Sequence, residues 1–237
     1  MVRRVESELG PISILVNNAG IMESVTLEEF DEAKFRRMMD VNLMGAIYTT
    51  LEALEDLKST RGVIVNVASN AGIGTALQGT TFYAVSKAAV IALTRRLAFD
   101  LAPYGIRVNA VAPGWVETDM TVGGRDAEAL RSFFRSRSML RMTCLPRHVA
   151  AAVLFLASPD SEYVTGQVPV ADRGGSDSLT PRLQAGGGRP GPPPLNPPRR
   201  PGRPRARSSS PTPSPAHATQ PPPTPTHTRT SSEHARR

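Results

Sequence analysis

Short apolar runs alternate with longer segments of mixed polarity along residues 1–175 of the chain. Most of these runs are rich in Val or Ile and polar only at their ends, which is typical of strands covered on both faces. They predict strands at residues 12–17, 63–68, 107–112 and 167–171. The last run contains Pro169, which a strand at the edge of a sheet tolerates because no neighbour needs its N–H group.

The segments between these runs have the periodicity of helices, and they predict helices at residues 28–58, 81–101, 125–137 and 146–157. In the second segment, Phe82, Val85, Ala89 and Leu93 recur at spacings of three and four and form an apolar stripe. Strands that alternate with such helices are typical of a doubly wound α/β fold around a parallel sheet.

The composition changes after Gly175. Residues 176–237 contain 16 of the 22 prolines and no aromatic residue, Val or Ile. Such a segment cannot bury enough apolar surface to offset its chain entropy. We therefore expect a folded domain over residues 1–175 and a disordered, Pro- and Arg-rich tail over residues 176–237. The tail could bind a polyproline-reading domain, or nucleic acid weakly, but a solvated tail is the simpler interpretation.

The excess positive charge lies in this tail. The chain has a formal net charge of +7, whereas residues 176–237 carry ten Arg against Asp177 and Glu233 and contribute +8. Residues 1–175 therefore sum to −1, which argues against a basic nucleic-acid-binding domain.

Cysteine usage and hydropathy indicate the compartment. Cys144 is the single cysteine, so no disulfide forms within the chain and a reducing compartment fits. The sequence has no run of about 18 apolar residues, and its first residues lack the apolar core of a signal peptide. We expect a cytoplasmic protein without a membrane segment.

The candidate chemistry begins with Tyr83 and Lys87, which lie four positions apart and so share one face of the predicted helix. A carbonyl group under reduction needs a proton donor at its oxygen, and a phenol can serve. The ordinary pKa of tyrosine, about 10, is high for this task, and a neighbouring ammonium would lower it. Taken alone, a Tyr and a Lys at this spacing also occur by chance on a surface helix.

Ser69 strengthens the interpretation, because it follows the strand predicted at 63–68. Open α/β sheets bind ligands at the carboxyl ends of their strands, so its hydroxyl can hold a substrate oxygen there. A Ser/His hydrolase is poorly supported, because His148 is the single histidine outside the tail.

With these residues, the chain resembles the short-chain dehydrogenase/reductase family over nearly all of residues 1–175. The resemblance implies a Rossmann-type fold and a catalytic tetrad of Asn42, Ser69, Tyr83 and Lys87. In this tetrad Asn42, from the segment Val41-Asn-Leu-Met-Gly45, anchors a proton-relay water. A structural alternative remains for Asn42, which could be a satisfied polar residue inside a helix.

The resemblance also implies NAD or NADP as cofactor, and no metal ion. Asn17-Asn-Ala-Gly20 resembles the motif that lies beside the adenosine ribose, although Asn17 and Asn18 could also merely cap a turn. Pro113-Gly-Trp-Val-Glu-Thr118 resembles the segment that meets the nicotinamide carboxamide. The cofactor-binding residues implied in this way are Asn18, Ala19, Gly20, Tyr83, Lys87, Pro113, Gly114, Val116 and Thr118.

The chain departs from the family at both ends. It begins just before the family's fourth strand, so we expect it to lack the first two strand-helix units. The TGxxxGxG turn that receives the cofactor pyrophosphate is absent, which leaves the choice between NAD and NADP unreadable. The strand at 12–17 then becomes an apolar edge. Near the other end, Arg173 interrupts the family pattern like an insertion, and the tail follows.

The resemblance implies an oxidoreductase that interconverts a ketone and a secondary alcohol, with 3-oxoacyl thioester reduction as the best match. Residues 120–142 fall at the family's substrate lid, and Phe133 and Phe134 suggest a hydrophobic acyl or ring substrate. Packing of this segment on the core explains them almost as well. A homo-oligomer is expected to form through the helices at 28–58 and 81–101. The alternative is a non-catalytic, truncated paralogue or gene fragment that pairs with a full-length subunit.

Overall fold

The computed structural model describes residues 1–74 and 77–175, which lie in one unit of the chain. These residues form a parallel sheet of four strands in the order β1-β2-β3-β4. The expected α/β fold with a parallel sheet is therefore confirmed. The strands are β1 (Ile14–Asn17), β2 (Val63–Val67), β3 (Arg107–Pro113) and β4 (Val170–Ala171). The prediction for residues 176–237 lies outside the described residues, and the domain boundary after Gly175 stays a prediction.

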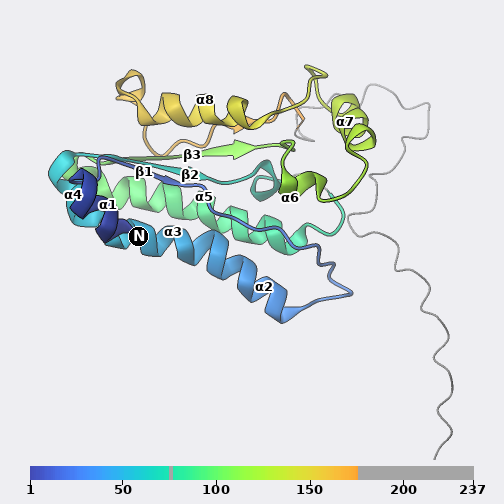
Figure 1. The fold of residues 1–237 in the computed structure, drawn as a ribbon, viewed down its shortest axis with the longest axis horizontal. Coiled ribbons are helices and arrows are strands. Elements are labelled where there is room, and N and C mark those ends of the chain that lie inside the picture. Colours follow the sequence, from blue (N-terminus) through green and yellow to red (C-terminus); the bar gives the residue numbers. More distant parts are fainter. Residues whose placement is uncertain (75–76, 176–237) are drawn as a thin grey trace, which may run out of the picture. The chain divides into compact units, whose positions relative to one another are not determined.

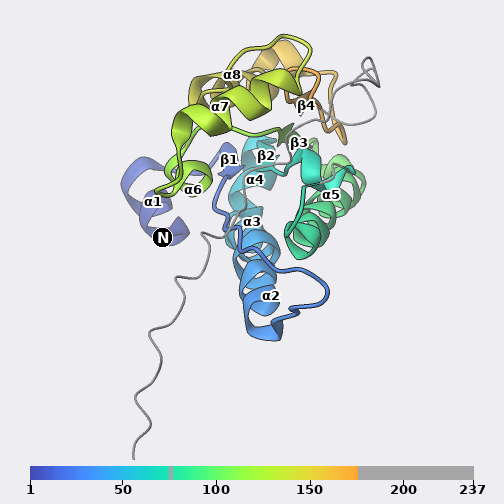
Figure 2. The ribbon, with the colours of Figure 1, turned by 90° about the vertical axis from the view of Figure 1, so that its right-hand side faces the viewer.

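Helices cover both faces of the sheet (Figures 1 and 2). One face carries α8 (Pro146–Ala157), and the other carries α5 (Thr81–Leu101) together with α3 (Gly45–Glu52) and α4 (Leu54–Thr60). Ile64, Val65 and Val108 are fully buried between these layers. The central strands β2 and β3 thus match the expectation of strands covered on both faces.

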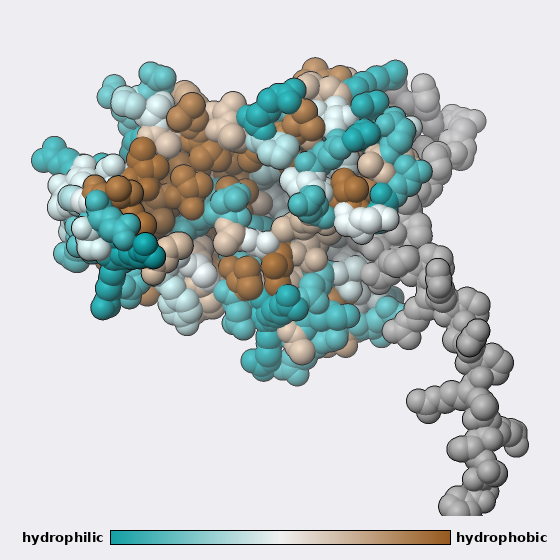
Figure 3. All heavy atoms as spheres, in the orientation of Figure 1, coloured by the Kyte–Doolittle hydropathy of each residue, from teal (hydrophilic) through white to brown (hydrophobic). Residues whose placement is uncertain are grey.

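The edge strand β1 is different. Among the described residues it pairs with β2 alone, and Ile14 and Val16 remain 51% and 42% exposed. In Figure 3 apolar surface gathers over this part of the molecule. The apolar edge expected at 12–17 is therefore present, although the strand starts two residues later, at Ile14.

The helix expected at 28–58 is divided. It begins with α2 (Glu32–Met39), where the Asp31 side chain accepts a hydrogen bond from the backbone N–H of Lys34, and continues as a π-helix (Asp40–Met44) into α3. The backbone leaves helical geometry at the fully buried Ala53 before α4 begins. The predictions for α5 and α8 are confirmed at both ends, whereas α7 (Ala127–Ser136) is shorter than expected.

Two short helices were not predicted: α1 (Val2–Leu9) and α6 (Asp119–Val122). The strand expected at 167–171 is reduced to the two residues of β4, although the carbonyl groups of Gln167 and Pro169 still accept hydrogen bonds from β3. Within the described residues, no helix has both the length and the apolar character needed to cross a membrane.

Candidate active site

The carboxyl end of β2 and the first turn of α5 bring Ser69 and Tyr83 together. Ser69 caps a 3₁₀ turn (Asn70–Gly72), and its hydroxyl accepts a hydrogen bond from the Ala71 backbone N–H at 3.1 Å. The same hydroxyl hydrogen-bonds the Tyr83 side chain. A carbonyl oxygen placed beside this pair would meet two hydroxyl groups that can donate to it.

Lys87 lies one turn further along α5 and is 4% exposed. Its ammonium group donates to the backbone carbonyl of Val67, the last residue of β2, with an Nζ to oxygen distance of 2.8 Å. None of its other N–H groups meets an acceptor among the described residues. Burial lowers the pKa of Lys87 to about 8, because the charged form is poorly solvated.

Burial raises the pKa of Tyr83, and the hydrogen bond from Ser69 opposes this effect only in part. This direction is opposite to the lowering by Lys87 that the sequence suggested. The physical reason is that the phenolate loses water in this site, while the Lys87 ammonium is directed to the Val67 carbonyl. Tyr83 is therefore a protonated phenol at neutral pH, which is the form that donates a proton.

Asn42 is buried in the π-helix, and its side chain is fully engaged. Its Oδ1 accepts from the Ile21 backbone N–H at 2.8 Å, and its Nδ2 donates to the Ile21 carbonyl and to Ser86 Oγ. Ser86 Oγ in turn donates to the Tyr83 carbonyl at 2.7 Å. Asn42 thus joins the loop after β1 to the turn of α5 that carries Tyr83. Sequence reasoning missed Ser86, although it directly precedes Lys87.

Besides Tyr83 and Lys87 on α5, the residues implied for the cofactor lie at the carboxyl ends of β1 and β3 and just after them. A Cβ atom on Gly20 would lie 3.2 Å from Lys87 Nζ and 3.3 Å from Asn42 Oδ1, so this loop lies directly against both. Asn18 and Ala19 are exposed beside it. The Lys87 N–H groups without acceptors fit a ligand with hydroxyl groups, such as a ribose.

The segment after β3 supplies the other implied cofactor residues. Pro113 is buried at the end of the strand, and Gly114 packs so closely on Asp172 that a Cβ would come within 2.7 Å of the Asp172 Cβ. Thr118 caps α6, where its backbone N–H donates to Thr121 Oγ1. The Val116 carbonyl also accepts from Thr121, so this hydroxyl holds the segment in shape.

A cavity of about 140 Å³ opens over Ser69 and Tyr83. Its opposite wall is aromatic, because Trp115 stacks on Phe134 with ring centroids 4.7 Å apart and Phe133 meets Phe134 edge-on. Helices α6 and α7, which provide much of this wall, lie at the end of the sheet to which β3 points (Figure 1). Within the segment 120–142, the apolar residues that line the cavity are Met120, Leu130, Phe133 and Phe134.

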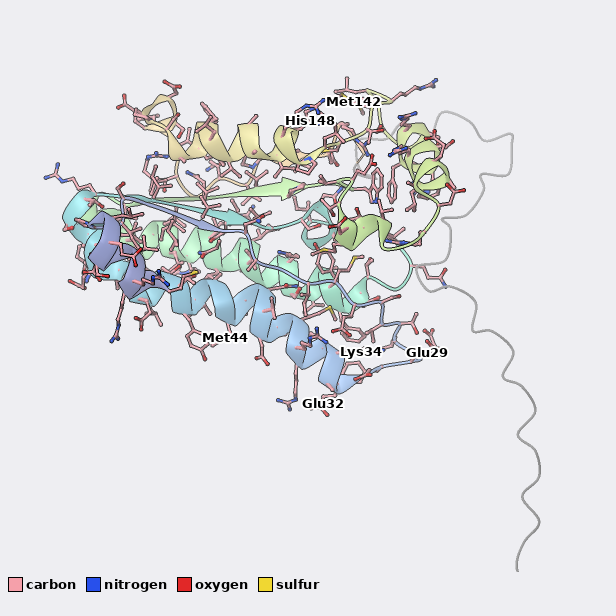
Figure 4. The ribbon with its side chains drawn as sticks, viewed as in Figure 1. Glu29, Glu32, Lys34, Met44, Met142 and His148 are labelled. Atoms are coloured by element: carbon pink, nitrogen blue, oxygen red, sulfur yellow. The ribbon has the colours of Figure 1, made fainter. Side chains whose placement is uncertain are left out.

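His148 takes no part in this site. It lies at the start of α8 (Figure 4), where its Nδ1 accepts a hydrogen bond from the Leu145 backbone N–H at 3.0 Å. In the part of the chain that the structure describes, no three His, Cys, Asp or Glu side chains cluster as they would around a metal ion.

Replacement of Lys87 by Met is expected to stabilise the fold near neutral pH. The pKa of Lys87 is about 8 in the folded state against 10.5 without burial, so folding costs about 3 kcal/mol wherever both states hold the proton. Between these two pKa values Lys87 is protonated in the unfolded chain but not in the folded one, so the free energy of unfolding of the parent protein rises with pH. In urea unfolding, the Lys87→Met variant should therefore have a larger free energy of unfolding than the parent at about pH 7, and this difference should shrink towards about pH 10.

Lys34, which is exposed on α2 (Figure 4), gives the matched control. Its ion pair with Asp31 lies at the surface and contributes little, so its replacement by Met should not give the stabilisation near pH 7 that is expected for the Lys87 variant. A constant difference between the Lys87 variant and the parent across this pH range would contradict the lowered pKa.

Comparisons with known proteins agree with this geometry. A family model described as enoyl-(acyl carrier protein) reductase matches residues 1–176. The 3-oxoacyl-[acyl-carrier-protein] reductase of Thermotoga maritima is 43% identical over 175 residues, which cover 73% of this chain and 70% of that protein. The meso-2,3-butanediol dehydrogenase of Serratia marcescens is 37% identical, with 72% and 67% covered.

A solved structure is similar as well. A gluconate 5-dehydrogenase from Burkholderia cenocepacia, crystallised in complex with NADP and tartrate, superposes with a TM-score of 0.69 at 31% identity. The match covers 73% of this chain and 68% of that one.

Proposed function

Because this chain belongs to the short-chain dehydrogenase/reductase family, we propose that its cavity interconverts a ketone and a secondary alcohol with NAD or NADP. The 3-oxoacyl-[acyl-carrier-protein] reductase and the meso-2,3-butanediol dehydrogenase described above are relatives whose names describe such reactions. The observation that carries the proposal for this chain is the contact between Ser69 and Tyr83 at the cavity, with Lys87 one turn away on α5.

In the reducing direction, Tyr83 donates its phenolic proton to the substrate oxygen, and the Ser69 hydroxyl holds that oxygen by a hydrogen bond. When bound, the cofactor would supply hydride to the substrate carbon in this direction and accept it in the other. The Lys87 ammonium lies one turn further along α5 and donates to the Val67 carbonyl, so the return of a proton to Tyr83 by way of Lys87 and Asn42 stays a prediction. Asn42 positions the Tyr83 turn through Ser86, and its relay water stays a prediction.

The cofactor would bind along the carboxyl ends of the strands. We assign the adenosine ribose to Asn18, Ala19 and Gly20. We assign the nicotinamide ribose to the N–H groups of Lys87, which lies one turn after Tyr83 on α5. We assign the nicotinamide carboxamide to the segment from Pro113 to Thr118. The similar gluconate 5-dehydrogenase was crystallised with NADP, and the described residues of this chain favour neither cofactor over the other.

A 3-oxoacyl thioester is the first substrate to test, since the 3-oxoacyl-[acyl-carrier-protein] reductase relative and the apolar cavity wall both support it. A homo-oligomer formed through residues 28–58 and 81–101, and a cytoplasmic location, remain predictions. The rival proposal, a non-catalytic chain that pairs with a full-length subunit, differs in its requirement for that second chain.

The proposal is tested by titrating the purified 237-residue chain with NADH and NADPH while following nicotinamide fluorescence. We expect saturable binding, and then loss of nicotinamide absorbance when an acetoacetyl thioester or a simple ketone is added. Binding without consumption of any ketone would overturn the enzymatic proposal. Binding that appears only with an added full-length relative would favour the rival.

A further inference from the structure

We propose that the cavity selects substrates that carry a carboxylate, and that Arg173 is the main residue that recognises it. This inference rests on the proposed function, because it names the substrate class of the same site. It also gives a role to the residue that most clearly interrupts the family pattern.

The charge of the cavity lining is the first observation. Three guanidinium groups line it, from Arg125, Arg137 and Arg173. Among the described lining residues, Asp172 is the one acidic side chain, so positive charge is in excess by two. Asp172 is also buried, and its oxygens accept hydrogen bonds from the Gly174 N–H and from Asn70 Nδ2.

The backbone at Arg173 is the second observation. Its φ angle is +64°, in the left-handed region that a residue with a side chain adopts only at a cost. The surrounding contacts hold it there. The Leu140 N–H donates to the Arg173 carbonyl, and the guanidinium donates to the carbonyl of Met142, in the loop that leads to α8 (Figure 4). These contacts place the Arg173 side chain in the wall of the cavity.

Arg173 differs from Arg131 in the groups that its guanidinium contacts. Outside the cavity, Arg131 pairs with the carboxylates of Glu117 and Glu128, which raise its pKa. Arg173 instead donates to the neutral carbonyl groups of Met142 and Asp172, and burial lowers its pKa despite the nearby Asp172 carboxylate. A neutral acceptor satisfies N–H groups without cancelling their charge, and a substrate carboxylate would cancel it.

The same cavity offers a place for the rest of the substrate. Ser69 and Tyr83 would take the reacting oxygen, and the Trp115 and Phe134 stack would cover the carbon skeleton. The planar fork of a guanidinium matches the two oxygens of a carboxylate. The cavity therefore fits a short oxo acid, or the hydroxy acid formed from it, better than a 3-oxoacyl thioester, whose acyl group has no free carboxylate.

Trp115 makes the inference testable without cofactor or turnover. It is the chain's single tryptophan and lies in the cavity wall, so its fluorescence reports on ligands that enter. We would titrate the full chain with 4-oxopentanoate and with its neutral analogue 4-oxopentanamide. The carboxylate is expected to bind about tenfold more tightly, as one charge-assisted pair provides.

Replacement of Arg173 by Gly removes the guanidinium and also suits the positive φ angle, so the variant should fold. We expect this variant to bind 4-oxopentanoate and 4-oxopentanamide with affinities that differ by less than about twofold. Arg61→Gly is the matched control, because Arg61 also has a positive φ of 51°, is exposed and lies outside the cavity lining. Its preference should equal that of the parent.

Equal affinity for the two probes, no binding of either, or a preference that survives Arg173→Gly would each overturn the inference. These outcomes are separate from failure of the proposed function. Selective binding of 4-oxopentanoate without any consumption of NADH or NADPH would refute the enzymatic proposal alone, whereas equal turnover of acids and neutral ketones would refute the carboxylate preference alone.

Discussion

Replacement of Tyr83 by Phe is expected to slow ketone reduction by about 10²–10⁴-fold, the usual contribution of a positioned proton donor. The substitution removes only the phenolic hydroxyl. Because burial raises the pKa of Tyr83, this hydroxyl is protonated at neutral pH and ready to donate. Ser69 keeps its hydrogen bond from Ala71, so the loss of stability should be about 1 kcal/mol.

The measurement is single-turnover oxidation of NADH or NADPH in the presence of a ketone, with cofactor affinity determined in parallel. The control is Tyr163→Phe, since Tyr163 is fully exposed and should leave the rate unchanged. If the Tyr83 variant reduced the ketone at nearly the parent rate, another group would have to donate the proton.

The parts of the fold that could be predicted are those determined by local sequence. The strands β2 and β3 follow from continuous apolar runs, and α5 follows from its apolar stripe. The break at Ala53 carries no proline or glycine signal, because it arises where the helix packs against the core. The short helix α1 carries Val2, Val5 and Leu9 at spacings of three and four, a helical signal that our prediction did not use, although Val2 is the one of the three that is buried.

In the candidate site, too, only the features determined by local sequence could be predicted. The spacing of Tyr83 and Lys87, and the position of Ser69 after a strand, predict that these residues meet, because helix periodicity and strand ends are local properties. The partner of Lys87 is a carbonyl 20 residues away, and Asn42 reaches Ile21 across 21 residues. Such contacts depend on how elements pack, which is why the direction of the Tyr83 pKa shift could not be predicted.

Replacement of Gly72 by Ala is expected to destabilise the fold by about 1–3 kcal/mol and to slow turnover by about 10²-fold. Gly72 ends the 3₁₀ turn that begins after Ser69, and a Cβ there would lie 2.6 Å from the Ala88 nitrogen and 2.7 Å from the Lys87 carbonyl carbon. Both atoms belong to the backbone of α5 and cannot rotate away. The turn must therefore move off the helix, and Ser69 moves with it, away from Tyr83.

Gly45→Ala provides the comparison that separates this close approach from a general effect of removing glycine. The nearest atom to a Cβ on Gly45 is the Asp40 carbonyl oxygen at 3.7 Å, an ordinary contact within a helix. That variant should gain about 0.5–1 kcal/mol in urea unfolding and keep its turnover. Since the two substitutions add the same methyl group, equal stability and equal rates in both variants would mean that the turn after Ser69 does not pack on α5 as described. A loss of rate in Gly72→Ala alone ties the position of Ser69 to the chemistry.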